Sequence, residues 1–404
     1  MKKIVNGPSE EKKKEESERL LQKEPWIWWR EKMPVTQHWA YFDHAAVSPL
    51  SGPAAAAVQQ FAVESRDSGD MNWLQWAATA EKLRGQCAEL LQADPGEICL
   101  VPNTTSGINL VAEGFPWAPG DSVVIPEGEF PSNLFPWKNQ AQKGVELRIV
   151  PRRDGQVRVD DLLERVDSTT RIISVSWVGY ASGFRIDLNQ LVQRAHERGV
   201  LVFLDAIQGL GIFPLDLRET PVDFLAADGH KWLLGPEGIG VSMVRKQHLN
   251  QLRCGGVGWN SVKNAFNYAE PKMELRDAAS RFEGGSLNLM GIAALSASIE
   301  LFLRIRSIHG QDAIEQRILH LADVLEHRLE ELGVSTRLSA RPEHRSGIVT
   351  FEVPGIDPAE FRRFALKQQV VLSCRDGGVR ASIHAYNNEV DLDRLVRLVE
   401  QHLT

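Results

Sequence analysis

The sequence predicts an α/β fold built around a mostly parallel β-sheet, and three observations lead to this class. Short apolar runs alternate with helical stretches between residues 98 and 244. The runs are apolar along their whole length, which is typical of strands buried on both faces of a parallel sheet. The chain of 404 residues is long enough for one large domain and a smaller one.

Seven apolar runs are candidate strands, so we expect a seven-stranded sheet after a mainly helical segment at 53–92. The runs are "ICLVP" at 98–102, "SVVIP" at 122–126, "ELRIV" at 146–150, "RIISVSW" at 171–177, "VLVFLD" at 200–205, "DFLAA" at 223–227 and "GIGVSMV" at 238–244. Helical stretches between them include "TSGINLVAEGF" and "DLNQLVQRAHERG". Alternation of this kind places helices on both faces of the sheet.

The pattern changes near residue 289 and indicates a second, α+β domain. The expected elements are helices at 289–306 and 312–332, a strand at 347–353, a helix near 358–368, short strands near 370–383 and a last helix at 391–403. We therefore expect a charged, frayed or loosely helical tail at 1–24, a large domain at 25–288 and a small domain at 289–404.

Composition excludes several classes of function. The formal net charge of −7 argues against a broad nucleic-acid surface. No apolar run approaches the length of a membrane helix, and the N-terminus lacks the apolar core of a signal peptide. Four cysteines without a C-x-x-C pair do not form a disulfide scaffold. We expect a cytoplasmic protein that binds no nucleic acid, no membrane and no metal.

Lys231 lies in an unusual setting, the stretch "AADGHKWLLGPEGIG" at 226–240. Apolar runs and glycines surround it, and burying an ammonium group is costly unless its pKa falls. A lysine with a lowered pKa is a good nucleophile at neutral pH. The alternative is a surface loop from which the lysine reaches water.

Two other candidate strands also end in polar residues, and ligands of open α/β sheets bind at such ends. Asn103, Thr104, Thr105, Ser106 and Gly107 open a helix after one strand, which suits an anion, although a simple N-cap would look similar.

Asp205 ends another strand, and Gln208 follows it. The carboxylate could neutralise a cation or simply begin a turn. A lysine, a carboxylate and a phosphate cradle together match what pyridoxal phosphate requires. The motifs of P-loops, dinucleotide folds, zinc proteases and serine hydrolases are absent from the sequence.

From Tyr41 onward the chain resembles fold-type I pyridoxal-phosphate enzymes of the class V aminotransferase and cysteine desulfurase family. The motifs that carry this resemblance follow one another in the family's order. They are "YFDHAAVSP", "NTTSGINLVA", "EFPSNLFPW", "LDAIQG", "DGHKWLLGPEGIG", "RFEGGSLN" and "VRASIHAYNNEVDLDRLV".

The resemblance implies roles for individual residues. Lys231 would hold pyridoxal 5'-phosphate covalently, and Asp205 would pair with its ring nitrogen. The other cofactor-binding positions implied by the motifs are Thr104, Thr105, Ser106, Phe130, Gln208, Asp228, His230 and, from a partner subunit, Ser286. Substrate-binding positions are His44, Ala45 and Arg380, of which Arg380 would bind the carboxylate. Family members are commonly homodimers with shared sites, so we expect a homodimer.

Four departures from the family pattern bear on the reaction. Phe130 stands where desulfurases have a histidine, and it can stack on a ring but cannot move protons. Asp228 stands where many members have serine, and an anion beside a phosphate needs a compensating donor. Gly179 stands where relatives often place Asn or Gln near the cofactor oxygen. Only "RDGGV" separates Cys374 from Arg380, which leaves no room for the loop that carries the desulfurases' persulfide cysteine.

We therefore expect a pyridoxal-phosphate enzyme acting on a small amino acid or amine, with Lys231 as the general base at the substrate's α-carbon. An aminotransferase is the first choice. Alternatives are a carbon–sulfur or carbon–selenium lyase without a persulfide cysteine, an epimerase, and a non-catalytic cofactor-binding scaffold. The same residues serve all three reactions, so the sequence does not separate them.

Overall fold

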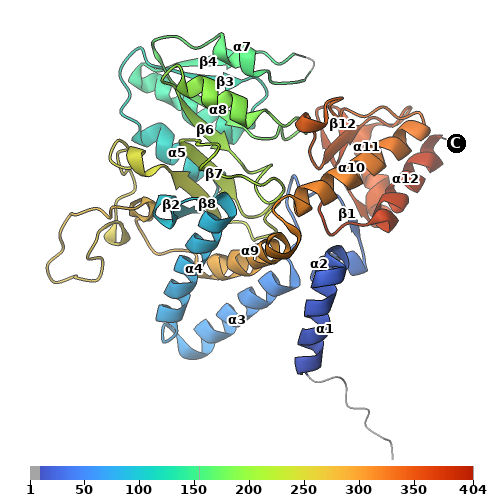
Figure 1. Ribbon diagram of the computed structural model, residues 1–404, viewed down its shortest axis with the longest axis horizontal. Coiled ribbons are helices and arrows are strands. Elements are labelled where there is room, and N and C mark those ends of the chain that lie inside the picture. Colours follow the sequence, from blue (N-terminus) through green and yellow to red (C-terminus); the bar gives the residue numbers. More distant parts are fainter. Residues whose placement is uncertain (1–9, 154, 404) are drawn as a thin grey trace, which may run out of the picture.

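The computed structural model describes residues 10–153 and 155–403, and a seven-stranded sheet forms the middle of its larger body (Figure 1). The strand order is β2-β8-β7-β6-β5-β3-β4. The strands are β2 (Ile98–Val101), β3 (Ser122–Pro126), β4 (Glu146–Val150), β5 (Thr170–Ser176), β6 (Leu201–Asp205), β7 (Phe224–Asp228) and β8 (Gly240–Val244). β8 pairs antiparallel with β7 and β2, and the other pairs are parallel. The predicted mostly parallel α/β sheet is confirmed.

Helices cover both faces of the sheet because alternate residues of each buried strand point to opposite sides. On one face, α4 (Trp73–Leu91), α8 (Leu188–His196) and α9 (Leu289–His309) pack on Val124, Ile173, Leu204 and Leu225. On the other face, α5 (Thr104–Gly114) and α6 (Phe135–Asn139) pack on Val123, Ile172, Phe203 and Phe224. The segment expected to be helical at 53–92 forms two helices, α3 (Gly52–Ser68) and α4, since the chain turns at Gly69 with a φ of 59°.

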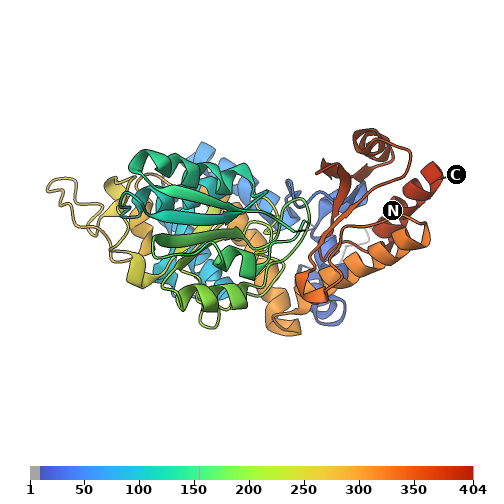
Figure 2. The same ribbon diagram turned by 90° about the horizontal axis from the view of Figure 1, so that it is seen from above.

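A second core forms around a three-stranded antiparallel sheet of order β11-β12-β9, on one side of the larger body (Figures 1 and 2). Its strands are β9 (Ile348–Phe351), β11 (Ser373–Arg375) and β12 (Gly378–Ser382), and its helices are α10 (Ala313–Glu331), α11 (Pro358–Lys367) and α12 (Glu389–Leu403). The short strand β1 (Ala40–Tyr41) pairs with β10 (Val370–Val371), and Phe42 is buried in this core. Residues 40–42, which the proposed boundary at 288/289 assigns to the large domain, therefore pack in the core of the C-terminal part.

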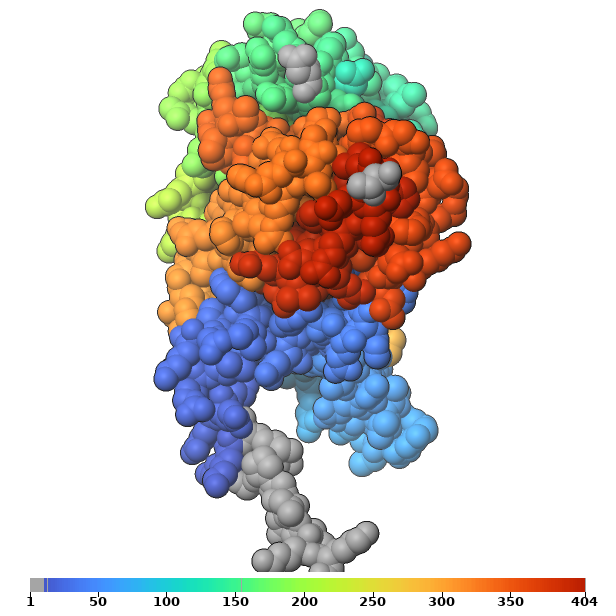
Figure 3. All heavy atoms as spheres, turned by 90° about the vertical axis from the view of Figure 1, so that its right-hand side faces the viewer, coloured from blue at the N-terminus to red at the C-terminus, as the bar shows by residue number. Residues whose placement is uncertain are grey.

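The N-terminal segment is more ordered than its charge suggests. Glu10–Lys23 form helix α1, and Pro25–Glu31 form α2. Leu21 is fully buried, its carbonyl accepts a hydrogen bond from His309 Nε2 at 2.8 Å, and Trp28 Nε1 donates to Ser17 at 3.0 Å. Figure 3 shows this blue segment directly beneath the orange and red C-terminal part. The expectation of a frayed or loosely helical tail misses this packing, because it depends on α9, far along the chain.

Within residues 10–153 and 155–403, none of the helices has the length and apolar character needed to cross a membrane.

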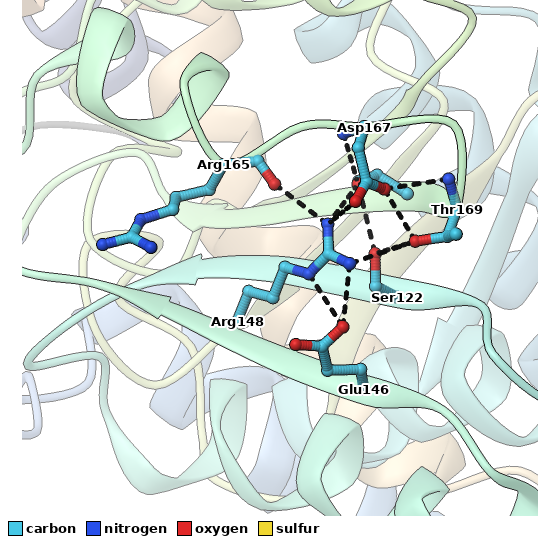
Figure 4. Close-up of polar contacts among 7 residues, drawn as sticks. Ser122, Glu146, Arg148, Arg165, Asp167 and Thr169 are labelled. Carbon is cyan, nitrogen blue, oxygen red and sulfur yellow. Dashed lines mark hydrogen bonds and ion pairs between the residues drawn. The ribbon is translucent and has the colours of Figure 1, made fainter.

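Arg148 secures the exposed edge of the large sheet, strand β4 (Figure 4). Its guanidinium donates to Glu146 at 2.8 Å and to the carbonyl of Arg165 at 3.2 Å. It also lies 2.8 Å from the carboxylate of Asp167. The two carboxylates raise the pKa of Arg148, so the charge is retained at all ordinary pH values. One side chain thus ties the edge strand to the loop before β5.

Replacing Arg148 by methionine should destabilise the fold while leaving the site intact. Arg148→Met keeps an unbranched aliphatic stem but removes every hydrogen bond of the guanidinium, so the free energy of unfolding should fall by about 1 kcal/mol. Urea unfolding measures the change. Arg165→Met is the matched control, because the side chain of Arg165 points away from the cluster in Figure 4. Equal losses in both variants would contradict the assignment.

Candidate active site

The predicted site residues converge at the carboxyl ends of β5, β6 and β7, on the face covered by α5. Ser176 is the register partner of Asp205, and Asp205 is the register partner of Ala226. Helix α5 approaches this edge closely at Gly107, where a Cβ atom would lie 2.6 Å from that of Ala226. Glycine at 107 therefore lets the N-terminus of α5 lie beside the strand ends.

Lys231 lies in the turn that follows β7, and its side chain is buried. It therefore does not reach water from a surface loop, which was the alternative interpretation of the sequence. The residue is only 8% exposed, and its Nζ lies 5.6 Å from the centre of the Phe130 ring. Burial lowers the pKa of Lys231 to about 8, and the positive charges of Arg380 and Arg375 add to this effect, while Asp205 opposes it. A substantial neutral fraction at neutral pH makes the amine a competent nucleophile and base.

Asp205 is a buried carboxylate that suits a cationic partner. It is 2% exposed, and its Oδ1 accepts a hydrogen bond from the backbone of Ile207 at 3.1 Å. Burial raises the pKa of Asp205 to about 6. Among the described residues no cation forms an ion pair with it, although buried carboxylates normally have one. A protonated ring nitrogen fits this position.

Gln208 has both ends of its amide engaged within the chain. Its Oε1 accepts from Trp232 at 2.7 Å, and its Nε2 donates to the carbonyl of Ala45 at 3.0 Å. The Nε2 group carries a second hydrogen, which leaves one donor for the phenolic oxygen predicted as its partner.

The hydroxyl groups at the start of α5 differ in what they offer an anion. Asn103 caps the helix and binds both the N–H and the hydroxyl of Ser106. Thr105 donates its hydroxyl to Ser132 at 2.8 Å. Thr104 accepts from the backbone N–H of Asp228 at 2.9 Å, so its own hydroxyl proton can be donated. With the N–H groups of the first helical turn, this end suits a phosphate.

Asp228 and His230 lie side by side next to the start of α5. Asp228 Oδ1 and His230 Nδ1 lie 3.0 Å apart, and neither atom has a hydrogen bond within the described part of the chain. Both are buried polar atoms beside the helix start to which Asp228 is bonded. His230 is therefore the side chain within reach of Asp228 that could compensate its carboxylate beside a phosphate.

Phe130 and Ser286 lie open to the surroundings. The ring of Phe130 is 43% exposed and contacts Tyr180 edge to face at 5.3 Å, which leaves a face free for stacking. Ser286 is exposed and lines, together with Ser106, a cavity of about 540 Å³. Its loop is anchored by Glu283, whose carboxylate accepts two hydrogen bonds from Arg84 at 2.6 and 3.0 Å.

Arg380 is fully inside the protein and already bonded. It is 1% exposed and donates to Ser373 at 3.0 Å, to the carbonyl of Tyr180 at 2.7 Å and to Asp43 at 3.1 Å. Burial lowers the pKa of Arg380. A substrate carboxylate would therefore share the guanidinium with Asp43.

His44 and Ala45 belong to the segment at 43–45, here called the strap, which connects the two cores through hydrogen bonds. His44 is fully buried, and burial lowers its pKa to about 4, so the ring is neutral. Its Nδ1 donates to the carbonyl of Ser382, and its Nε2 accepts from the hydroxyl of Tyr386. The N–H of Ala45 donates to Ser382 as well. Both ring nitrogens of His44 are therefore engaged within the chain. The predicted contact with a substrate could not be a hydrogen bond from this ring unless one of these bonds is broken.

Sequence reasoning missed three charged residues around the site, namely Asp43, Glu129 and Arg375. Asp43 and Glu129 lie inside motifs already singled out, directly before His44 and Phe130. A lone acid in a polar turn usually indicates a solvated position, and only contacts across the chain show that these two are partly buried. Arg375 acts electrostatically on both Lys231 and Arg380.

Comparisons with known proteins place the chain among enzymes of one family. The family model for "Aminotransferase class-V" matches residues 40–395. A probable cysteine desulfurase of Methanothermobacter thermautotrophicus is 28% identical over 398 residues, covering 92% of this chain and 96% of that protein. A cysteine desulfurase of Yersinia pseudotuberculosis is 30% identical over 337 residues, covering 78% of this chain and 80% of that protein.

Solved structures agree. The apo cysteine desulfurase of Thermococcus onnurineus superposes with a TM-score of 0.83 at 25% identity, over 92% of this chain and 96% of that one. A cystine C–S lyase complexed with cysteine persulfide shares the fold, with a TM-score of 0.84 at 22% identity, over 91% of this chain and 99% of that one. The predicted fold type and the predicted cofactor, pyridoxal 5'-phosphate, are confirmed. The chain belongs to the class V aminotransferase family of pyridoxal-phosphate-dependent enzymes.

Proposed function

We propose that this enzyme is a lyase that breaks the bond between the β-carbon and sulfur, or selenium, of a small amino acid, with no persulfide on the protein. This is the alternative of the sequence analysis, and it has more support than the aminotransferase placed first, because the similar proteins cited above carry the names of desulfurases and a C–S lyase.

One observation carries the second half of the proposal, the position of Cys374. Strands β11 and β12 are joined by the two-residue turn Asp376–Gly377, with Arg375 paired to Gly378. Both turn residues have positive φ, 53° and 77°, as tight hairpins require. The hairpin is therefore too short to carry a cysteine toward Lys231.

Cys374 itself faces away from the site. Its neighbour Ser373 contacts Arg380, whereas the Sγ of Cys374 lies 3.1 Å from the carbonyl of Pro358 in α11. Burial raises the pKa of Cys374, which disfavours the nucleophilic thiolate. Cys87 and Cys99 are buried, and Cys254 contacts the carbonyl of Arg281. With no protein thiol to accept sulfur, sulfur would leave with the product.

Each site residue then has a defined task. When bound, the cofactor supplies an aldehyde that condenses with amines and a cationic ring that withdraws electrons. Lys231 would hold that aldehyde, and its amine would remove the proton from the substrate's α-carbon. Asp205 would keep a proton on the ring nitrogen, and Phe130 would pack against the ring. The electron pair of the broken bond would stay on sulfur, which would leave as sulfide or a thiol, and the amino acrylate left behind would take up water to give a 2-oxo acid and ammonia.

Substrate orientation falls to Arg380, whose planar fork matches a carboxylate. Asp43 lies on one side of that fork. The proposal includes a homodimer in which Ser286 contacts the partner's cofactor phosphate, and it includes the cytoplasmic location expected from the sequence.

Product analysis with a panel of amino acids tests the proposed reaction. Cysteine, cystine and selenocysteine should yield sulfur or selenium species together with a 2-oxo acid and ammonia in equal amounts. Accumulation of pyridoxamine phosphate with a 2-oxo acid, but without ammonia or sulfide, would show an aminotransferase instead. Loss of the α-proton's stereochemistry without products would show an epimerase.

Cys374→Ser should keep its activity within about twofold of the wild type, since the thiol faces α11 and takes no part in the reaction. Release of sulfide from cysteine, measured in the absence of added thiols, provides the rate. A variant whose activity falls by orders of magnitude, with an unchanged melting temperature, would show that Cys374 carries sulfur.

The apoenzyme should bind its cofactor covalently with a rate governed by the pKa of Lys231. The neutral amine is the reactive form, so the rate should rise with pH and level off above about pH 8, rather than near the ordinary lysine value of 10.5. Stopped-flow absorbance follows the attachment. Borohydride trapping and peptide mapping should find the cofactor on Lys231, and a plateau only near the ordinary value would contradict the assigned burial effect.

His230 should matter chiefly because it offsets Asp228. His230→Gln leaves the carboxylate uncompensated beside the phosphate and should weaken cofactor binding about tenfold. Asp228→Asn alone should leave binding unchanged or slightly tighter, and the double variant should recover most of the loss. The measurement is the equilibrium dissociation constant of the cofactor for the wild type, both single variants and the double variant, which together form a double-mutant cycle. A double variant as weak as His230→Gln would show that His230 holds the phosphate directly.

A further inference from the structure

Glu129 places a second acid beside Asp205. It follows strand β3 and directly precedes Phe130. Its carboxylate accepts hydrogen bonds from the backbone N–H of Ser176 at 2.7 Å and from the hydroxyl of Ser176 at 2.5 Å. Ser176 ends β5 and is paired in register with Asp205 on β6. Register partners in a parallel pair share a face, so the two carboxyl groups lie one strand apart on the cofactor's side of the sheet.

The surroundings of Glu129 make its charge sensitive to pH near neutrality. Burial raises the pKa of Glu129 to about 7, with a further rise from the negative charge of Asp205, while both bonds from Ser176 oppose the rise. The other charged groups near it are Arg152 and Glu127, which line the same narrow cavity with Tyr180. Lys231 acts electrostatically on Asp205.

Hydrogen bonding alone does not explain an acid at this position. A glutamine could accept from the N–H of Ser176 and donate to its hydroxyl, without the cost of a partly buried charge. No ion pair compensates Glu129 in the described part of the chain. A cation that neutralises Glu129 and Asp205 would therefore have to be part of a bound ligand. The family's cofactor provides such a cation, its protonated ring nitrogen, which we place opposite Asp205.

We propose that Glu129 is a positioning residue for the cofactor, an ionisable second carboxylate that strengthens the hold of Asp205 on the positive ring nitrogen. Ionised Glu129 favours the cationic ring, and protonated Glu129 weakens it. Cofactor affinity therefore rises as Glu129 loses its proton. This inference depends on the cofactor and not on which reaction the enzyme catalyses, so it can fail or hold independently of the proposed lyase.

The test measures affinity of the apoenzyme for 4'-deoxypyridoxine 5'-phosphate, which keeps the ring and phosphate but has no aldehyde for Lys231. In the wild type the dissociation constant should fall about tenfold between about pH 6 and about pH 8 beyond the change due to the ligand's own phosphate. Glu129→Gln should lose this tenfold component and bind as the protonated wild type does. Glu127→Gln, the matched control two residues away, should retain it.

A second variant distinguishes charge from structure. Ser176→Ala removes one of the bonds that lower the pKa of Glu129, so the pH at which affinity changes should move upward. Melting temperatures of the apo variants establish that each is folded. The proposal is overturned if Glu129→Gln keeps the wild-type pH profile, or if it weakens binding by the same factor at every pH, which is the behaviour of a purely structural residue.

Discussion

The burial of two opposite charges, those of Lys231 and Asp205, is the constraint on which the site depends. Both groups have been moved out of water toward the same edge of the sheet, with exposures of 8% and 2%. Desolvation shifts each toward its neutral form, which lowers the pKa of Lys231 to about 8 and raises that of Asp205 to about 6. Their mutual attraction only partly offsets this. A cofactor that takes up the amine and supplies a cation to the carboxylate relieves both costs.

The rest of the architecture holds these groups in place from three directions. Helix α5 reaches the strand ends because residue 107 is glycine, and Thr104 bonds the last residue of β7. The strap at 43–45 bridges the two cores through Ser382 and Gln208. Arg380 joins β12 to Asp43 and to the carbonyl of Tyr180. Arg380 thus lies at the junction of the two cores, so displacing Asp43 from Arg380 would also act on that junction.

The departures from the desulfurase pattern form a consistent chemical picture. Phe130 can stack but not transfer protons, and the hairpin after Cys374 is only a two-residue turn. Both changes remove groups that would handle sulfur on the protein. Lys231, Asp205 and Arg380, the residues to which we assign activation of the α-carbon and binding of a carboxylate, are all buried at the site. These departures are the structural basis on which we propose a lyase that leaves no sulfur on the protein.

The sequence by itself determined the class of fold, the order of the strands along the chain and the cofactor. These depend on local patterns, such as the apolar runs that become β3 and β4 at the predicted residues, and on motifs such as "DGHKW". Only the tertiary structure decided which polar groups are free. His44 lies in a motif but has both ring nitrogens bonded to residues more than three hundred positions away, and the carboxylate of Glu129 is bonded by Ser176, 47 positions along the chain. The docking of α1 on α9 is of the same kind. Burial and pairing are properties of contacts between distant segments, and these contacts set the pKa values, so no local pattern reports them.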